Sequence, residues 1–127
     1  MSGADTEVTH VVGDVSGRAC LIVDDMISTG GTVAESIVAL LSVGARPEIM
    51  VAATHGLFVL DAREKLSHPA VRYVYVTDTV RVGELPQLRV VSIAPLLAAA
   101  LRRLLADGHR GETASPDGFS SNHEDAP

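Results

Sequence analysis

The sequence is poor in the residues that recognise nucleic acids or form disulfides. Aromatic residues make up 3% of the 127 residues and Trp is absent, so a platform on which nucleobases stack is not expected. The formal net charge is −6 and Lys65 is the only lysine, so we expect no surface for a nucleic-acid backbone. The single cysteine, Cys20, lies in an apolar run, which predicts a buried reduced thiol and a cytoplasmic protein.

Long hydrophobic runs and a secretory leader are also missing. The opening residues, MSGADTEVTH, are polar and acidic, unlike a signal peptide. The longest apolar stretch, residues 90–101, contains Ser92 and Pro95 and is too short to cross a bilayer. We therefore expect a soluble protein that has no membrane partner.

The composition predicts one α/β domain followed by a polar tail. Hydrophobic residues make up 46% of the chain and charged residues 20%, as is typical of globular proteins, and the length suits a single core. Residues 1–107 carry the periodic hydrophobic pattern. Residues 108–127 have almost nothing to bury, so we expect a disordered tail.

Apolar runs alternate with helical spacing along the domain. The runs predict strands at residues 20–23, 49–53, 71–76 and 88–93, and the spacing predicts helices at residues 32–43, 60–66 and 94–105. Residues 10–18 suggest an edge strand and a tight turn. This order predicts an open, mostly parallel sheet flanked by helices, with residues 20–23 covered on both faces.

Local signals predict how two of these helices begin, end and pack. Thr32 and Glu35 form a capping-box pattern at the start of the first helix, although Thr29 could cap it instead, and Gly44 predicts its end. In the last helix we expect an inner side formed by Leu96, Leu97, Ala100 and Leu104.

An acidic pair and a hydroxyl-rich loop follow the first buried run. Asp24 and Asp25 come directly after it, and the loop before the first helix contains Ser28, Thr29, Gly30, Gly31 and Thr32. Ligands of open α/β sheets collect at the carboxyl ends of the strands, and a helix N-terminus attracts anions. The loop has no lysine, so it is not a Walker A loop, and backbone N–H groups, hydroxyls, arginines or a metal must hold any phosphate.

This arrangement suits a ligand with vicinal hydroxyls at one end and a phosphate at the other. Carboxylates accept hydrogen bonds from hydroxyls, and ribose 5-phosphate has the required shape. The acidic pair could also orient Mg²⁺ through water, because magnesium often bridges carboxylates and phosphates. The alternative interpretation is a plain turn that ends in a helix cap.

The segment VDDMISTGGT resembles the phosphoribosyl-diphosphate (PRPP) loop of type I phosphoribosyltransferases and of ribose-phosphate diphosphokinase, the PRPP synthase. Further matches in the same order narrow the resemblance to the synthase, and the chain resembles most of the second half of that enzyme. These matches are VVGDVSGR at residues 11–18, AATHGLF at 52–58, VTDTV at 76–80 and VVSIAPLLAAALRR at 90–103.

The resemblance implies a type I phosphoribosyltransferase-like fold that is truncated at its N-terminal side, and a role for each motif residue. Asp24 and Asp25 would bind the ribose 2- and 3-hydroxyls, and residues 28–32 would cradle the 5-phosphate. His55 could face the ligand or could be a structural loop histidine. No catalytic residue is assigned, and the ligands of the implied Mg²⁺ remain open.

The family reaction transfers a diphosphoryl group from ATP to ribose 5-phosphate, with Mg²⁺. In the family, a basic catalytic loop and an ATP-binding half lie upstream of the segment that begins here at Met1. The resemblance therefore implies a truncated or split synthase or a catalytic relic, and in a split enzyme a second polypeptide must bring the ATP-binding half. Two alternatives remain: a small phosphoribosyltransferase that uses PRPP, and a non-catalytic subunit that senses PRPP or associates with a synthase. The exposed sheet edge predicts a homo-oligomer or a complex with a PRPP-synthase-like chain.

Overall fold

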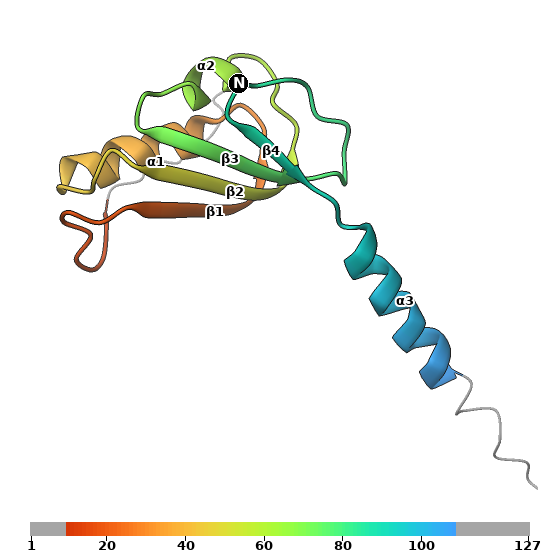
Figure 1. The fold of residues 1–127 in the computed structure, drawn as a ribbon. Coiled ribbons are helices and arrows are strands. Elements are labelled where there is room, and N and C mark those ends of the chain that lie inside the picture. Colours follow the sequence, from red (N-terminus) through yellow and green to blue (C-terminus); the bar gives the residue numbers. More distant parts are fainter. Residues whose placement is uncertain (1–9, 109–127) are drawn as a thin grey trace, which may run out of the picture. The chain divides into compact units, whose positions relative to one another are not determined.

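A parallel sheet forms the centre of the fold (Figure 1). The computed structural model describes residues 10–108. Its sheet has four strands in the order β1-β2-β3-β4, and each neighbouring pair is parallel. The strands are β1 (Cys20–Ile27), β2 (Ile49–Gly56), β3 (Val71–Thr77) and β4 (Leu88–Val91). The predicted open, parallel α/β fold is confirmed.

Helices connect the first three strands. Helix α1 (Gly31–Ser42) joins β1 to β2, and the short helix α2 (Ala62–Leu66) joins β2 to β3. β3 continues to β4 through residues 78–87, which form neither a helix nor a strand. Helix α3 (Ala94–Gly108) follows β4. The sequence predicts this order of elements correctly.

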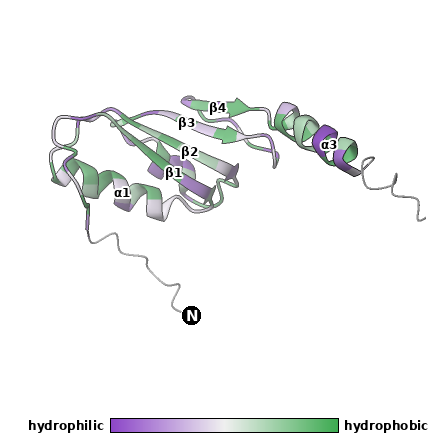
Figure 2. Cartoon of the chain, turned by 90° about the horizontal axis from the view of Figure 1, so that it is seen from below, coloured by the Kyte–Doolittle hydropathy of each residue, from purple (hydrophilic) through white to green (hydrophobic). Residues whose placement is uncertain are grey.

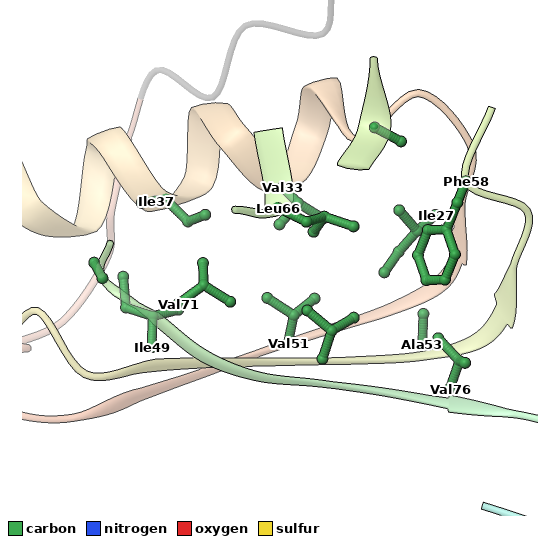
Figure 3. Packing of buried hydrophobic residues seen from close by; sticks show 13 residues of the cluster. Ile27, Val33, Ile37, Ile49, Val51, Ala53, Phe58, Leu66, Val71 and Val76 are labelled. Atoms are coloured by element: carbon green, nitrogen blue, oxygen red, sulfur yellow. The ribbon is translucent and has the colours of Figure 1, made fainter. Parts of the chain in front are cut away.

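One face of the sheet packs against α1 and α2 to form the core (Figure 3). Alternate residues of each strand point to this face, as strand geometry requires. Ile49, Val51 and Val74 of the strands are fully buried there, as are Ile37 of α1 and Leu66 of α2. Within residues 10–93, this packing supplies the main hydrophobic contribution to stability.

The other face of the sheet is apolar but exposed within residues 10–93. Leu21 and Val23 point away from the core and are 55% and 72% exposed. Figure 2 shows α1 on one side of the sheet formed by β1 to β4. The prediction that residues 20–23 are covered on both faces is therefore wrong for this unit. Their uninterrupted apolar character does not identify what covers the second face.

Residues 10–19 form turns instead of the predicted edge strand. Asp14 Oδ1 accepts a hydrogen bond from the Ser16 N–H at 3.0 Å, and Gly17 has a left-handed φ of 68°. The Gly17 N–H then donates to the Gly44 carbonyl oxygen at 2.8 Å. These bonds hold the segment against the end of α1, and residues 10–19 form no strand. The predicted tight turn is present.

Helix α1 begins without the predicted capping box. Gly30 is the N-cap residue, with a left-handed φ of 74°, and no side chain bonds to the first turn. Thr32 lies inside the helix, where its carbonyl oxygen accepts a hydrogen bond from Ser36 Oγ. The predicted end is correct, because the Gly44 N–H donates to the Leu41 carbonyl oxygen just after the last helical residue.

The ends of β3 and β4 are joined by Asp78. Its N–H donates to the Val91 carbonyl oxygen, and its Oδ1 accepts a hydrogen bond from the Ile93 N–H at 2.8 Å. This backbone donor, together with a hydrogen bond from the Ser92 side chain, lowers the pKa of the Asp78 carboxyl. Asp78 therefore connects the last two strands at the carboxyl edge of the sheet.

Helix α3 belongs to a second compact unit, which begins at Ala94, while the first ends at Ile93. None of the α3 residues is buried in the structure, so the predicted inner side of Leu96, Leu97, Ala100 and Leu104 has no buried residue. Among residues 10–108, no helix is long and apolar enough to cross a membrane. The predicted disordered tail lies outside the described residues except for Gly108, and the domain boundary after residue 107 remains a prediction.

Candidate functional site

The predicted acidic pair and loop lie together at the carboxyl end of β1. The strand is longer than predicted, because Asp24 and Asp25 belong to it and it ends at Ile27. A cavity of about 320 Å³ lies at this strand end, within the range of roughly 300–1,000 Å³ that small-molecule sites occupy. Its lining includes all of the predicted carboxylate and loop residues: Asp24, Asp25, Ser28, Thr29, Gly30, Gly31 and Thr32.

The loop side of this cavity carries unpaired backbone donors. The Ala34 N–H is the first to make an intrahelical bond, to the Gly30 carbonyl oxygen at 2.9 Å. The N–H groups of Gly31, Thr32 and Val33 therefore precede the hydrogen-bond ladder of α1. The first turn has no acidic side chain that would compete for them. This end of the cavity can bind an anion.

The acidic side of the cavity is formed by adjacent carboxylates of β1. Asp25 is exposed and Asp24 is half-buried. The Asp25 N–H donates to Asp24 Oδ1 at 2.8 Å, which holds the Asp24 carboxylate at the strand end. Ionised carboxylates only accept hydrogen bonds, so this side suits hydroxyl groups of a ligand or a cation.

The segment after β2 is hydrogen-bonded to the start of the loop. The N–H groups of Leu57 and Phe58 both donate to the Ile27 carbonyl oxygen, at 2.9 and 3.2 Å. The Val59 N–H donates to the Ser28 carbonyl oxygen at 3.0 Å. These bonds attach the start of the loop to the connection between β2 and α2.

Helix α2 packs directly beside Gly30 of the loop. A Cβ atom on Gly30 would lie 3.4 Å from Ala62 Cα, an ordinary van der Waals contact, whereas the left-handed φ of 74° would strain any other residue. The backbone conformation explains why the loop has glycine at this position. The packing of α2 also places its following residues beside the loop.

Lys65 of α2 contacts the loop, which sequence reasoning did not predict. Its Nζ donates to the Thr29 carbonyl oxygen at 3.3 Å and to Asp61 Oδ1 at 3.2 Å. The Lys65 ammonium lowers the pKa of the Asp61 carboxyl, chiefly through that hydrogen bond. The available sequence signal was a carboxylate and a lysine four residues apart at the start of the next helix, but this spacing is also typical of surface ion pairs.

His55 lies within β2 and is not among the residues that line the loop cavity. Its Nδ1 and Thr79 Oγ1 are 2.7 Å apart. The hydroxyls of Thr77 and Thr79 both donate to the Thr54 carbonyl oxygen, at 2.7 and 3.2 Å. His55 thus belongs to a hydroxyl cluster that joins β2 to the residues after β3.

Asp24 also lines a second cavity, of about 240 Å³, on the open face of the sheet. Val23, Ala52 and Tyr75 form part of its apolar lining, and Thr77 lies at the strand end. The two cavities share only Asp24, so this residue borders both the anion-binding loop and the open face.

The acidic pair fits a metal ion that a ligand shares, but not a metal site made by the protein alone. Within residues 10–108, no group of three or more His, Cys, Asp or Glu side chains could hold a metal ion. Magnesium keeps several waters and commonly binds one or two carboxylates together with substrate phosphates. Asp24 and Asp25 are therefore suitable ligands for Mg²⁺ that is bound together with a phosphate.

The fold and this loop define an α/β protein with a hydroxyl- and glycine-rich loop at the carboxyl edge of a parallel sheet. The family model described as the phosphoribosyl synthetase-associated domain matches residues 4–115. The chain belongs to this family. The resemblance to ribose-phosphate diphosphokinase in the loop and the later segments is thereby confirmed.

Curated relatives and a solved structure agree with this assignment. Ribose-phosphate pyrophosphokinase from Mycobacterium leprae (strain TN) is 48% identical over 102 residues, which are 78% of this chain and 31% of the relative. The protein of the same name from Bifidobacterium longum (strain NCC 2705) is 45% identical over 106 residues, 81% of this chain and 31% of the relative. The crystal structure of phosphoribosylpyrophosphate synthetase from Mycobacterium smegmatis matches with a TM-score of 0.69 and 43% identity, over 76% of this chain and 33% of that one. The chain thus spans about a third of the length of these proteins.

Proposed function

We propose that this chain binds ribose 5-phosphate or PRPP at the carboxyl end of β1, as one component of a ribose-phosphate diphosphokinase. The observation that supports the proposal most directly is the loop cavity, which all of the predicted carboxylate and loop residues line. One side of this cavity offers acceptors for hydroxyls and the other offers donors for an anion. Ribose 5-phosphate and PRPP present both groups.

Each side of the cavity would bind a different part of the ligand. Asp24 and Asp25 would accept hydrogen bonds from the ribose 2- and 3-hydroxyls. The N–H groups of Gly31, Thr32 and Val33, with the hydroxyls of the loop, would donate to the 5-phosphate. Bound Mg²⁺ would supply positive charge beside the phosphate oxygens, with Asp24 and Asp25 as its protein ligands.

We propose that a second polypeptide supplies the groups that transfer the diphosphoryl group. Phosphoryl transfer requires cations that neutralise the charge of the transferred group. The residues that line the loop cavity include none with a positive charge. This chain would hold and orient ribose 5-phosphate, so that its anomeric hydroxyl can attack the β-phosphate of ATP bound by the partner.

The partner could be a PRPP-synthase-like chain or further copies of this chain. The apolar face of the sheet supports association, because large apolar patches commonly mark protein interfaces. Leu21, Val23 and Tyr73 on this face are 55%, 72% and 41% exposed. A cytoplasmic location, suggested by the single cysteine, remains a prediction.

Calorimetric titration of the full chain with ribose 5-phosphate, with and without Mg²⁺, tests the proposal. The wild-type chain should bind saturably, and Mg²⁺ should strengthen binding. The double variant Asp24→Asn, Asp25→Asn should bind at least about tenfold more weakly, because it replaces the charged acceptors of the hydroxyls. Glu84→Gln, which removes an exposed carboxylate away from the loop cavity, is the matched control. A folded wild-type chain that binds no ribose 5-phosphate contradicts the proposal.

The need for a partner is tested by product formation. Mixing this chain with an ATP-binding fragment of a related synthase, ribose 5-phosphate, ATP and Mg²⁺ should produce AMP. Neither component should do so alone. If the mixture is no more active than its components, the split-enzyme part of the proposal is wrong, and binding without turnover would indicate a regulatory subunit.

A further inference from the structure

Lys65 is the only lysine of the chain, and its ammonium bonds to the backbone of the phosphate loop. Its Nζ donates to the Thr29 carbonyl oxygen at 3.3 Å, and its side chain is 32% exposed. Thr29 and Lys65 are 36 positions apart in the sequence. The contact therefore depends on how α2 packs beside the loop.

The ammonium is itself held in place by Asp61. Lys65 Nζ lies 3.2 Å from Asp61 Oδ1 and 3.1 Å from Asp61 Oδ2. The carbon chain of Lys65 also passes close to the loop, since a Cβ atom on Gly30 would lie 3.6 Å from Lys65 Cβ. An ion pair and backbone contact thus restrict where the ammonium can donate its hydrogen bond.

A bond to the Thr29 carbonyl determines the direction of the next N–H group. The Thr29 C=O and the Gly30 N–H belong to one planar trans peptide unit, so they point in opposite directions. When Lys65 holds the carbonyl toward α2, the Gly30 N–H is turned away from α2. Within residues 10–108, this N–H has no protein acceptor. Gly30 lines the loop cavity, whereas Lys65 does not.

We propose that Lys65 is a positioning residue of the phosphate loop. It fixes the Thr29–Gly30 peptide so that the Gly30 N–H is available to a phosphate in the cavity, in line with the donors of the first turn of α1. The ammonium contacts the back of the loop and not the ligand. This inference rests on the proposed binding of a sugar phosphate at the loop.

The test compares a phosphorylated ligand with its unphosphorylated form. Lys65→Met removes the donor and keeps an apolar side chain of similar length. We expect it to weaken binding of ribose 5-phosphate about tenfold, as for the loss of a hydrogen bond to a charged group, and to leave the weak binding of ribose unchanged. Lys65→Arg should restore most of the affinity, because guanidinium N–H groups can also donate to the carbonyl.

Two further variants separate positioning from a general effect on the fold. Asp61→Asn leaves Lys65 in place but removes its ion pair, so its effect on ribose 5-phosphate should be smaller than that of Lys65→Met. Arg63→Met removes a cation from an exposed position of the same helix, and binding should not change. The amide NMR signal of Gly30 should move on titration with inorganic phosphate in the wild-type chain and move less in Lys65→Met.

The possible outcomes distinguish this inference from the proposed function. If the wild-type chain binds ribose 5-phosphate and Lys65→Met binds it equally well, the positioning role is wrong and the proposed function stands. The same conclusion follows if Lys65→Met weakens ribose and ribose 5-phosphate by equal factors. If the wild-type chain binds no phosphorylated ligand, both the proposed function and this inference are wrong.

Discussion

The connection from β1 to α1 and the connection from β2 to α2 both turn a strand into a helix, but with different residues. The first uses hydroxyl side chains and glycines, and its left-handed residue is Gly30. The second uses large apolar residues, and Phe58 and Leu60 have positive φ values of 46° and 53°. Helix α1 has 12 residues and α2 has 5.

This difference agrees with the proposed binding role of the first connection and with the supporting contacts of the second. The first connection leaves its backbone N–H groups free and its backbone open to a ligand, which glycine allows. The second places Phe58 and Leu66 in the core and Lys65 against the loop. It also contains Phe58 and Leu60 in left-handed conformations that would be less strained for glycine. Two connections of the same type therefore have different functions because their side chains differ.

The largest expected effect is the loss of core packing by α2, the helix that follows the second connection. Leu66 of α2 is fully buried, so Leu66→Ala should lower the free energy of unfolding by about 2–5 kcal/mol. Urea denaturation followed by circular dichroism measures the change. Val38→Ala in α1 is the control, because Val38 is 64% exposed, and it should change stability little. Equal effects of the two variants would show that α2 is not part of the core.

The glycines of the first connection should differ in their tolerance of alanine. Gly30→Ala should cost about 1–2 kcal/mol, because residue 30 has a left-handed φ that strains any residue with a Cβ atom. Gly31→Ala should be neutral or stabilising by up to about 1 kcal/mol, because Gly31 is helical and a Cβ atom there would have room. Thermal denaturation of both variants tests this. Equal costs would contradict the described loop conformation.

The second connection should become more stable when its strain is relieved. Leu60 is 87% exposed and has a positive φ, so Leu60→Gly should stabilise the chain by about 1 kcal/mol. Leu57→Gly is the matched control, because Leu57 has no positive φ and glycine there should only destabilise. The unfolding midpoints of the two variants, compared with that of the wild-type chain, test this expectation. Destabilisation by Leu60→Gly would show that this residue contributes contacts that outweigh the strain.

The smallest expected effect is a pH dependence of the stability that the Asp61–Lys65 ion pair contributes. The hydrogen bond from Lys65 lowers the pKa of Asp61 below its ordinary value of 3.8. The stabilisation from this pair is therefore fully present above that value, and it is lost as the pH falls through the lowered pKa of the folded chain. Measuring stability against pH for wild type and Asp61→Asn should show a small difference at neutral pH that disappears in acid. A difference that grows in acid would contradict the lowered pKa of Asp61.

The sequence predicts the positions of strands and helices well because local pattern determines them. Apolar runs, uninterrupted in β1 and β2 and broken by arginine in β3 and β4, predict the observed strands, and the spacing of Val33, Ile37 and Leu40 predicts α1. The predicted edge strand at residues 10–18 fails for a physical reason. A β-prone segment forms a strand only if it pairs with a neighbour, and here the backbone at Gly17 bonds to Gly44 after α1 and not to the free edge of β1.

The sequence predicts part of the candidate site, and it does so best for residues that are close together in the chain. Asp24, Asp25 and residues 28–32 share one cavity, as expected for a strand that runs directly into a helix. The capping box fails because Gly30 takes the N-cap position in a left-handed conformation. For His55 the sequence leaves open a position facing the ligand or a structural role, and its Nδ1 lies 2.7 Å from Thr79 Oγ1. Its role in binding remains a prediction.

The order of elements, the acidic pair and the composition of the loop follow from the sequence alone, because they depend on residues that are neighbours in the chain. Only the folded chain brings α2 against Gly30 and the Lys65 ammonium to the Thr29 carbonyl. The fold also determines which face of the sheet is exposed within residues 10–93. These features depend on parallel pairing of β1 with β2, which brings the connections that follow the two strands to the same edge of the sheet. A local sequence pattern does not show which distant residues come into contact at this edge.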